Sequence, residues 1–264
     1  MNEAILMSAS ADKIDFMIHG LYKLNVFGQE VWITTSHVCI AIVMMVLVIF
    51  AIVANRKLAK ATEVPDTFQN LLELVVELLD GIVESNMGSH AKVFANYICT
   101  IFAFILFSNI SGLFGLRPPT ADYGTTFALG IITFVLIHVT KWKNQSFKTI
   151  WTDMCSPLPP WFPLWLPINL ISEIAVPISL SLRLFANVLS GTVMMALVYG
   201  LLAKIAYAWP AVLHIYFDLF SGAIQTYVFC MLTMTYITQS YGDADLFEIH
   251  ILGGKNLWVS QVKI

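Results

Sequence analysis

Residues 168–205 read INLISEIAVPISLSLRLFANVLSGTVMMALVYGLLAKI, and Arg183 is the only formal charge between positions 174 and 203. At about 1.5 Å per residue, one helix over this stretch would be more than about 50 Å long. The hydrocarbon core of a bilayer is only about 30 Å thick. The sequence therefore predicts a membrane helix that is steeply tilted or bent, and Pro177 and Gly200 are positions that permit a bend.

A second long apolar element follows at about residues 210–240, after the break at Trp209 and Pro210. At about 1.5 Å per residue it would exceed about 40 Å, so it too is longer than an upright crossing requires. Two overlong helices in succession predict a strongly tilted hairpin. Such a hairpin suits a curved surface on a partner protein.

Three further apolar stretches are long enough to cross a bilayer: 37–54, 93–116 and 125–140. The whole chain of 264 residues is 58% hydrophobic and 12% charged. A soluble globular protein is typically about 45–50% apolar and about 25% charged. The composition therefore agrees with the local patterns, and we expect an all-α integral membrane protein with about five crossing helices.

Residues 66–86 differ from these stretches because four acids fall on one helical face, at spacings of four, three and four residues: Glu73, Glu77, Asp80 and Glu84. Four acids are too costly to hold in hydrocarbon. We therefore expect an amphipathic helix at the cytoplasmic surface, whose acidic face is interpreted as solvated. The proline- and tryptophan-rich residues 155–167 are interpreted as an interfacial loop.

The distribution of lysine and arginine predicts the orientation. With the N-terminus outside and five crossings, the inside segments hold nine basic residues and the outside segments four. We expect an extracytoplasmic segment at 1–36, a membrane domain at 37–241 with its core at 163–241, and a cytoplasmic tail at 242–264. The first 36 residues lack the pattern of a signal or transit peptide. The expected location is therefore the plasma membrane of a bacterium.

Arg183 is the residue that points most strongly to a function. A charged side chain near the bilayer centre costs at least about 2.5–3.5 kcal/mol, and an arginine does not escape this cost by losing its proton. Its presence implies a compensating anion or a water-filled cavity. The alternative is a buried salt bridge that serves only helix packing.

Polar residues form a stripe on each long element. The first stripe is spaced by four, four and three residues: Ser179, Arg183, Asn187 and Ser190. The second stripe comprises Asp218, Ser221 or Gly222, and Gln225. Two facing polar stripes with one arginine and one acid predict a hydrated path, because a carboxylate can take up and release a proton.

Glu173 precedes Arg183 by ten residues, or about 15 Å along a helix, toward the cytoplasmic end. Asp218 follows the outer turn. One acid on each side of a central arginine is the arrangement expected of two half-channels that meet at a cation. Glu173 is otherwise an ordinary interfacial acid. His138 and His214 are interpreted as interfacial, with a role as proton relays as the alternative.

Other classes of protein lack support in the sequence. We find no phosphate-binding loop, zinc motif or nucleophile elbow, so no active site, cofactor or metal is expected in this chain. The net charge of −3 indicates no nucleic-acid partner. The four cysteines fit neither a paired zinc motif nor a redox pair, and they are interpreted as small packing residues.

Three segments resemble one known family. These are PINLISEIAVPISLSLRLFANVLSG at 167–191, GAIQTYVFCMLTMTYI at 222–237 and NISGLFGLRPPTAD at 109–122. They are similar to the a subunit of the F-type ATP synthase, and the resemblance extends over roughly 37–241. It implies a stator subunit that passes protons, or alternatively Na⁺, to and from a rotating c-ring. The implied partners are this ring, the b subunits of the peripheral stalk, the remaining synthase subunits and the lipid bilayer.

The resemblance also implies roles for individual residues. Arg183 matches the essential arginine that faces the carboxylates of the c-ring, and Asn187 matches the asparagine one turn later. Gln225 matches the glutamine that faces this arginine. Glu173 is similar to the acid of the cytoplasmic half-channel, and Asp218 falls where many members carry His or Glu in the outer half-channel.

The chain also departs from the family pattern. Thr192 stands where many members have Glu, and Val176 replaces a commonly basic residue. The residues expected to take part in ion translocation are Arg183, Asn187, Gln225, Asp218, Glu173, Thr192, Ser179, Ser190 and Ser221. Two other functions stay open from the residues alone: a secondary transporter that binds an anionic substrate at Arg183, and a structural scaffold of the membrane.

Overall fold

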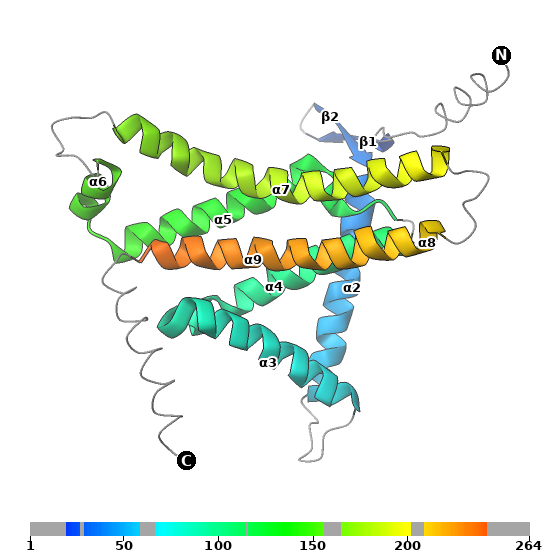
Figure 1. Cartoon of the computed structure of the whole chain (residues 1–264), viewed down its shortest axis with the longest axis horizontal. Coiled ribbons are helices and arrows are strands. Elements are labelled where there is room, and N and C mark those ends of the chain that lie inside the picture. Colours follow the sequence, from blue (N-terminus) through cyan, green and yellow to red (C-terminus); the bar gives the residue numbers. More distant parts are fainter. Residues whose placement is uncertain are drawn as a thin grey trace. The chain divides into compact units, whose positions relative to one another are not determined.

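The structure is a computed structural model that describes residues 20–26, 29–58, 67–114, 116–155, 165–201 and 209–241. Figure 1 shows its elements in chain order. The strands and long helices are β1 (Gly20–Val26), β2 (Gln29–Thr34), α2 (Thr35–Leu58), α3 (Thr67–Met87), α4 (Ala91–Ile110), α5 (Tyr123–Asn144), α7 (Trp165–Leu201) and α9 (Gly222–Gln239). Shorter helical segments lie between them: η1 (Gly88–His90), η2 (Ser111–Phe114), η3 (Pro119–Ala121), α6 (Phe147–Cys155), α8 (Trp209–His214) and η4 (Ile215–Ser221).

Five helical stretches of the described chain are long and apolar enough to cross a membrane, which confirms the predicted all-α membrane protein. They are Thr35–Leu58, Thr67–Phe114, Tyr123–Asn144, Pro167–Gly200 and Val212–Gln239. Many of their apolar side chains face outward; Met45 of α2, for example, is 63% exposed. Such exposure suits lipid rather than water as the surrounding solvent. The tilt of the last two helices stays a prediction.

Several local elements lie outside the predicted pattern. β1 and β2 pair as an antiparallel hairpin before α2, in a segment to which the sequence assigned no structure. Helix α6 was likewise not predicted. Residues 156–164, which hold most of the expected interfacial loop, and the predicted tail at 242–264 lie outside the described residues.

Helix α3 forms where the acidic amphipathic helix was predicted, and all four of its acids are exposed: Glu73, Glu77, Asp80 and Glu84. Gly88 ends this helix with a φ of 54°, in the left-handed region that glycine adopts without a steric penalty. The chain can therefore turn there into α4. The placement of α3 at the cytoplasmic surface stays a prediction.

The described chain divides into two compact units. The first unit is drawn from residues 1–51, 103–126 and 182–226, and the second from 52–102, 127–181 and 227–264. Helices α2, α4, α5, α7 and α9 each contribute residues to both units. Each unit contains a cluster of polar side chains, and the two clusters contain four of the nine predicted site residues: Asp218, Asn187, Ser221 and Glu173.

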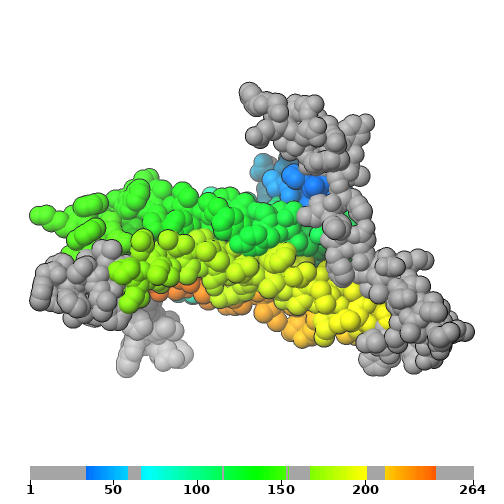
Figure 2. All heavy atoms as spheres, turned by 90° about the horizontal axis from the view of Figure 1, so that it is seen from above, coloured from blue at the N-terminus to red at the C-terminus, as the bar shows by residue number. Residues whose placement is uncertain are grey.

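In the second unit, α5 and the first half of α7 lie side by side, green against yellow-green in Figure 2. Gly130 permits this close approach, because a Cβ atom there would lie 2.8 Å from the carbonyl oxygen of Pro177. It would also lie 3.4 Å from Cβ of Ser181. A methyl group cannot fit at this distance from backbone without moving one helix.

We therefore expect Gly130→Ala to destabilise the protein by about 1–3 kcal/mol through overpacking. The effect is measured by heating the purified complex and recording the temperature at which this chain is lost from the soluble fraction. Gly81→Ala is the matched control, because a Cβ at Gly81 in the interior of α3 would meet nothing within 4 Å. Equal stability of the two variants would contradict the close packing of α5 against α7.

Candidate functional site

The polar cluster of the first unit is built around Asp218 on η4. Its Oδ2 lies 3.0 Å from Nδ1 of His214, one helical turn earlier. The other ring nitrogen of His214, Nε2, lies 3.1 Å from the hydroxyl oxygen of Tyr199 near the end of α7. The imidazole therefore connects a phenol and a carboxylate. The i,i+4 spacing of His214 and Asp218 is the signal in the sequence that indicates this link.

Residues Ile215–Ser221 form a π-helix rather than an α-helix. Its i→i+5 hydrogen bonds widen the turn, and such segments frequently lie at functional sites. The predicted stripe from Asp218 to Gln225 assumed α-helical spacing throughout. That spacing begins only at Gly222, so the two ends of this stripe do not follow one regular helical face.

Asn109 of α4 joins three segments in the same unit. Its amide nitrogen donates to the carbonyl oxygen of Gly222 at 3.1 Å and to Oγ1 of Thr226 at 3.4 Å. Its amide oxygen accepts a hydrogen bond of 2.8 Å from Oγ1 of Thr120. Gly222 makes this contact possible, because a Cβ there would lie 2.8 Å from Cβ of Asn109. The sequence analysis assigned Asn109 no role.

Asn187 and Ser221, both predicted site residues, are brought together. The Ser221 hydroxyl donates to Oδ1 of Asn187 at 2.9 Å, which links α7 to η4. Beside them is a small cavity of about 10 Å³, lined by Asn109, Asn187, Gly191, Phe217, Asp218 and Gly222. A volume of this size holds about one water molecule. The first unit thus places Asp218 and Asn187 at one small cavity, with Ser221 bonded to Asn187.

Arg183 is exposed on α7, and no hydrogen bond or ion pair joins it to any other residue that the structure describes. Ser179 and Ser190, its neighbours on the predicted stripe, are exposed as well. Gln225 is 8% exposed, and its Nε2 has no partner among the described residues. The predicted pairing of Arg183 with Gln225 within the chain is therefore not among the observed hydrogen bonds.

Thr192 makes its hydrogen bond within its own helix, because its hydroxyl donates to the carbonyl oxygen of Leu189 at 2.8 Å. Ser190 does the same to the carbonyl oxygen of Asn187 at 2.9 Å. These local bonds satisfy both hydroxyls without any neighbouring helix. Neither residue is bonded to Asp218.

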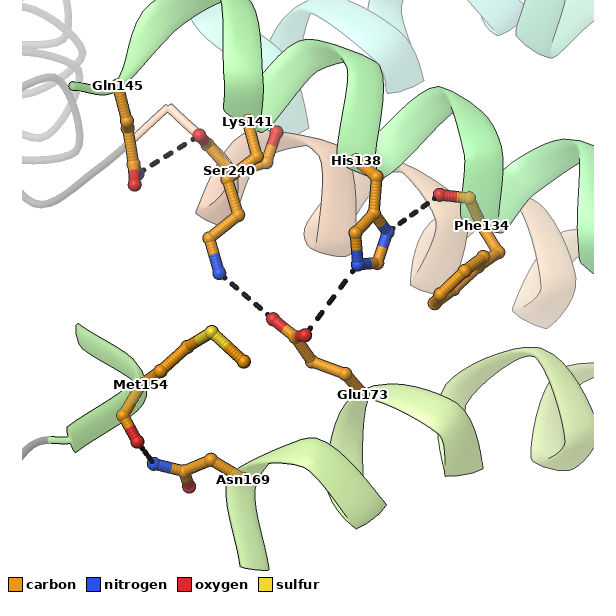
Figure 3. A network of polar contacts seen from close by, with 8 residues as sticks. All are labelled: Phe134, His138, Lys141, Gln145, Met154, Asn169, Glu173 and Ser240. Carbon is orange, nitrogen blue, oxygen red and sulfur yellow. Dashed lines mark hydrogen bonds and ion pairs between the residues drawn. The ribbon is translucent and has the colours of Figure 1, made fainter. Parts of the chain in front are cut away.

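The polar cluster of the second unit is built around Glu173 of α7. Lys141 of α5 donates to its Oε1 at 3.0 Å, and Nε2 of His138 lies 3.7 Å from its Oε2. Nδ1 of His138 lies 3.0 Å from the carbonyl oxygen of Phe134 in the preceding turn. Figure 3 shows the carboxylate between these two nitrogen-bearing side chains. Glu173 is thus paired within the chain, which its sequence neighbours did not indicate.

A cavity of about 240 Å³ adjoins this carboxylate, lined by residues that include His138, Lys141, Glu173, Tyr236, Gln239 and Ser240. The side chain of Gln145 donates to the carbonyl oxygen of Ser240 at 3.1 Å, which ties the end of α5 to the residue that follows α9 (Figure 3). The cavity has room for several water molecules. A wet cavity beside a carboxylate can exchange protons with bulk water.

The described residues contain no group of three or more His, Cys, Asp or Glu side chains that could hold a metal ion. Cys39, Cys99 and Cys230 are free thiols within helices. The two clusters consist of carboxylates, imidazoles, an ammonium group, a carboxamide and hydroxyls. Such groups move and hold protons, and they stabilise charge.

The model of one protein family, described as the ATP synthase A chain, matches residues 37–238. A protein of Propionigenium modestum named "ATP synthase subunit a, sodium ion specific" is 36% identical over 219 residues, covering 76% of this chain and 73% of that protein. The "ATP synthase subunit a" of Solidesulfovibrio magneticus is 36% identical over 232 residues, covering 85% and 92%. The "ATP synthase subunit a 1" of Chlorobium luteolum is 30% identical over 233 residues, covering 88% and 96%.

Proposed function

This chain belongs to the ATP synthase A chain family, and from this premise we propose that it forms two half-channels that carry ions to and from the c-ring. Membership makes it a membrane subunit of the ATP synthase, with the other synthase subunits as partners. The finer proposal concerns how ions cross. An ion enters from outside past Asp218, loads a carboxylate of the ring, and leaves to the cytoplasm past Glu173.

The observation that carries this proposal is the exposed guanidinium of Arg183, which has no partner among the described residues. Apolar residues extend on both sides of it along α7. A bare charge at this depth of a bilayer is expensive, so an anion from another chain is needed to stabilise it. The carboxylates of the c-ring have the required charge, and their passage past Arg183 is the step that couples ion flow to rotation.

Arg183 has two effects in this mechanism. A fixed cation favours the ionised form of a ring carboxylate, so the carboxylate releases its ion before it reaches the arginine. The same positive charge repels a cation that would pass straight from one half-channel to the other. The ring therefore has to turn almost a full circle, with its carboxylate neutralised in lipid, before the ion leaves.

The two acids supply the half-channels on either side of Arg183. Asp218 adjoins the small cavity of the first unit, and Glu173 adjoins the larger cavity of the second unit. With the N-terminus outside, Asp218 belongs to the outer half-channel and Glu173 to the cytoplasmic one. This orientation rests on the lysine and arginine distribution, and the proposed location is a bacterial plasma membrane.

Disulfide formation tests which face of α7 meets the ring. In a complex without the four native cysteines, Ser179→Cys and Ser190→Cys should each form a disulfide with a cysteine placed beside the ring carboxylate. Both positions are exposed and lie within about 40° of Arg183 around the helix. The products are measured as cross-linked bands after mild oxidation.

Leu189→Cys is the matched control, because Leu189 is 41% exposed but lies about 120° around the helix from Arg183. We expect no cross-link from this position. A cross-link from Leu189→Cys without one from Ser190→Cys would show that another face of α7 meets the ring.

A further inference from the structure

His214 is the only side chain among the described residues that bonds to Asp218, and its second ring nitrogen contacts Tyr199. The ring is also more exposed than the carboxylate, with 35% of the His214 side chain exposed against 21% for Asp218. We propose that His214 carries protons to Asp218, and that the outer half-channel therefore admits protons rather than Na⁺. This inference rests on the proposed function of Asp218 as the acid of the outer half-channel.

The position of the ring suits a carrier of protons. Imidazole has two nitrogens, and it can accept a proton on one while it donates a proton from the other. Nε2 points to the more exposed Tyr199, which is 45% exposed, and Nδ1 points to the carboxylate. A ring that served only to hold η4 in place would need just one of these contacts.

The neighbours of His214 leave no competing carrier on the described elements around it. The titratable groups that contact its ring are Tyr199 from α7 and Asp218 from η4. Thr192 stands where an acid is common in the family, but its hydroxyl is bonded to its own helix. His214 is thus the titratable side chain that contacts Asp218 in the proposed outer half-channel.

The proposed proton transfer from outside water to the ring carboxylate has three steps. A proton from outside water, passed directly or through the Tyr199 hydroxyl, binds Nε2 of neutral His214 and gives an imidazolium ion. Nδ1 then releases its proton to Oδ2 of Asp218, which leaves a neutral imidazole and a neutral carboxylic acid. Asp218 passes this proton to the ring carboxylate and is ionised again. The neutral ring now carries its proton on Nε2, and loss of that proton to water with uptake of another at Nδ1 restores the starting tautomer.

The groups around Asp218 are not suited to binding a sodium ion. Hard cations bind several oxygen atoms at once, yet one oxygen of Asp218 faces a nitrogen of His214. The other, Oδ1, lies 3.4 Å from the position of a Cβ on Gly112, against the turn after α4. The adjoining cavity of about 10 Å³ has room for one water, not for a cation with its hydration shell.

The cytoplasmic acid supports the same conclusion independently. Both oxygens of Glu173 face nitrogen atoms, one the Lys141 ammonium and the other the His138 ring. The ammonium repels a second cation, whereas a proton can pass through water and imidazole. Specificity for protons would distinguish this chain from the relative in Propionigenium modestum, which is named as sodium ion specific.

The test uses the complete membrane sector in vesicles after removal of the soluble ATPase sector. A potassium diffusion potential drives proton entry, which a pH-sensitive dye inside the vesicles reports in sodium-free buffer. We expect His214→Ala to slow conduction at least about tenfold, the lower range for loss of a positioned proton-transfer group. Added imidazole should restore a large part of the rate. Tyr199→Phe should slow it less, because water can replace the hydroxyl.

His214→Gln keeps hydrogen-bonding capacity but cannot carry a proton, so it should be as slow as His214→Ala in a fully assembled complex. His37→Ala is the control at a histidine outside the cluster, and it should conduct at the wild-type rate. Wild-type conduction by His214→Gln, failure of imidazole to restore His214→Ala, or a requirement of the wild type for Na⁺ would each overturn the inference. If one of these results were found and Arg183→Ala still lost ATP-driven pumping, the inference about His214 would be wrong and the proposed function would stand.

Discussion

Arg183→Ala is expected to reduce ATP-driven ion pumping to background while the ATP synthase still assembles. The exposed guanidinium has no partner among the described residues, so its removal breaks no bond within them. It does remove the only fixed positive charge in the apolar stretch from 174 to 203. In the proposed mechanism, a ring carboxylate then keeps its ion at the interface, and nothing blocks a direct leak between the half-channels.

Pumping is measured by the quenching of a pH-sensitive dye in inverted membrane vesicles, after the amounts of all subunits have been compared with wild type. Arg183→Lys keeps the charge but loses the planar fork of donors, so coupled transport should be lost as well. Arg56→Ala is the matched control, because Arg56 lies in the last turn of α2, and we expect normal pumping.

The opposite outcome would also be informative. Normal pumping by an assembled Arg183→Ala complex would mean that the arginine is a packing charge and that the half-channel mechanism is wrong. Poor assembly of the variant would favour the structural scaffold that the residues alone left open. Flux that depends on an anionic substrate, without the ring, would favour a secondary transporter.

Asn109→Leu is expected to have the next largest effect, on stability rather than on ion transfer. Leucine has a similar size but leaves the Thr120 hydroxyl without its partner. The Gly222 carbonyl oxygen loses one donor and keeps the Thr226 hydroxyl. A buried polar group that loses its partner costs about 1–3 kcal/mol. Asn109 is 4% exposed and Thr120 is fully buried, so water cannot replace the lost bonds.

The loss should appear as a lower thermal unfolding temperature and as less of this chain in the purified complex. Thr100→Val is the matched control on the same helix, because the exposed Thr100 hydroxyl bonds only to the carbonyl oxygen of Asn96. We expect that variant to behave as wild type. Equal stability of Asn109→Leu and Thr100→Val would argue against a structural role for the Asn109 network.

The sequence was sufficient for features that depend on local composition. Hydropathy along the chain predicted five crossing helices, and the described residues contain five helical stretches of sufficient length and apolarity. Arg183 was recognisable because its charge is alone in a long apolar stretch, and its motif led to the family that the match over 37–238 shows. These inferences needed only a window of neighbouring residues, because the cost of a charge in lipid is a local property.

The sequence did not predict the type of helix around Asp218. The spacing of Asp218 and Gln225 was interpreted as α-helical, whereas η4 is a π-helix over Ile215–Ser221. A π-helix differs from an α-helix by one residue in its hydrogen-bond spacing, and no residue type specifies it. Asn109 of α4 donates to the carbonyl oxygen of Gly222, directly after the π-helix. This contact comes from a distant part of the chain, so the sequence around Asp218 does not reveal it.

The sequence by itself therefore determined which residues are charged at membrane depth, and only the tertiary structure decided what surrounds them. Glu173 is paired with Lys141, a residue 32 positions away, and Asn109 bonds to Gly222 at a separation of 113 positions. Such pairs form because polar groups withdrawn from water must find partners on whichever helix packs beside them. Close contacts such as that of Gly130 with Pro177 decide which helices pack together. The order of residues along the chain does not reveal these contacts.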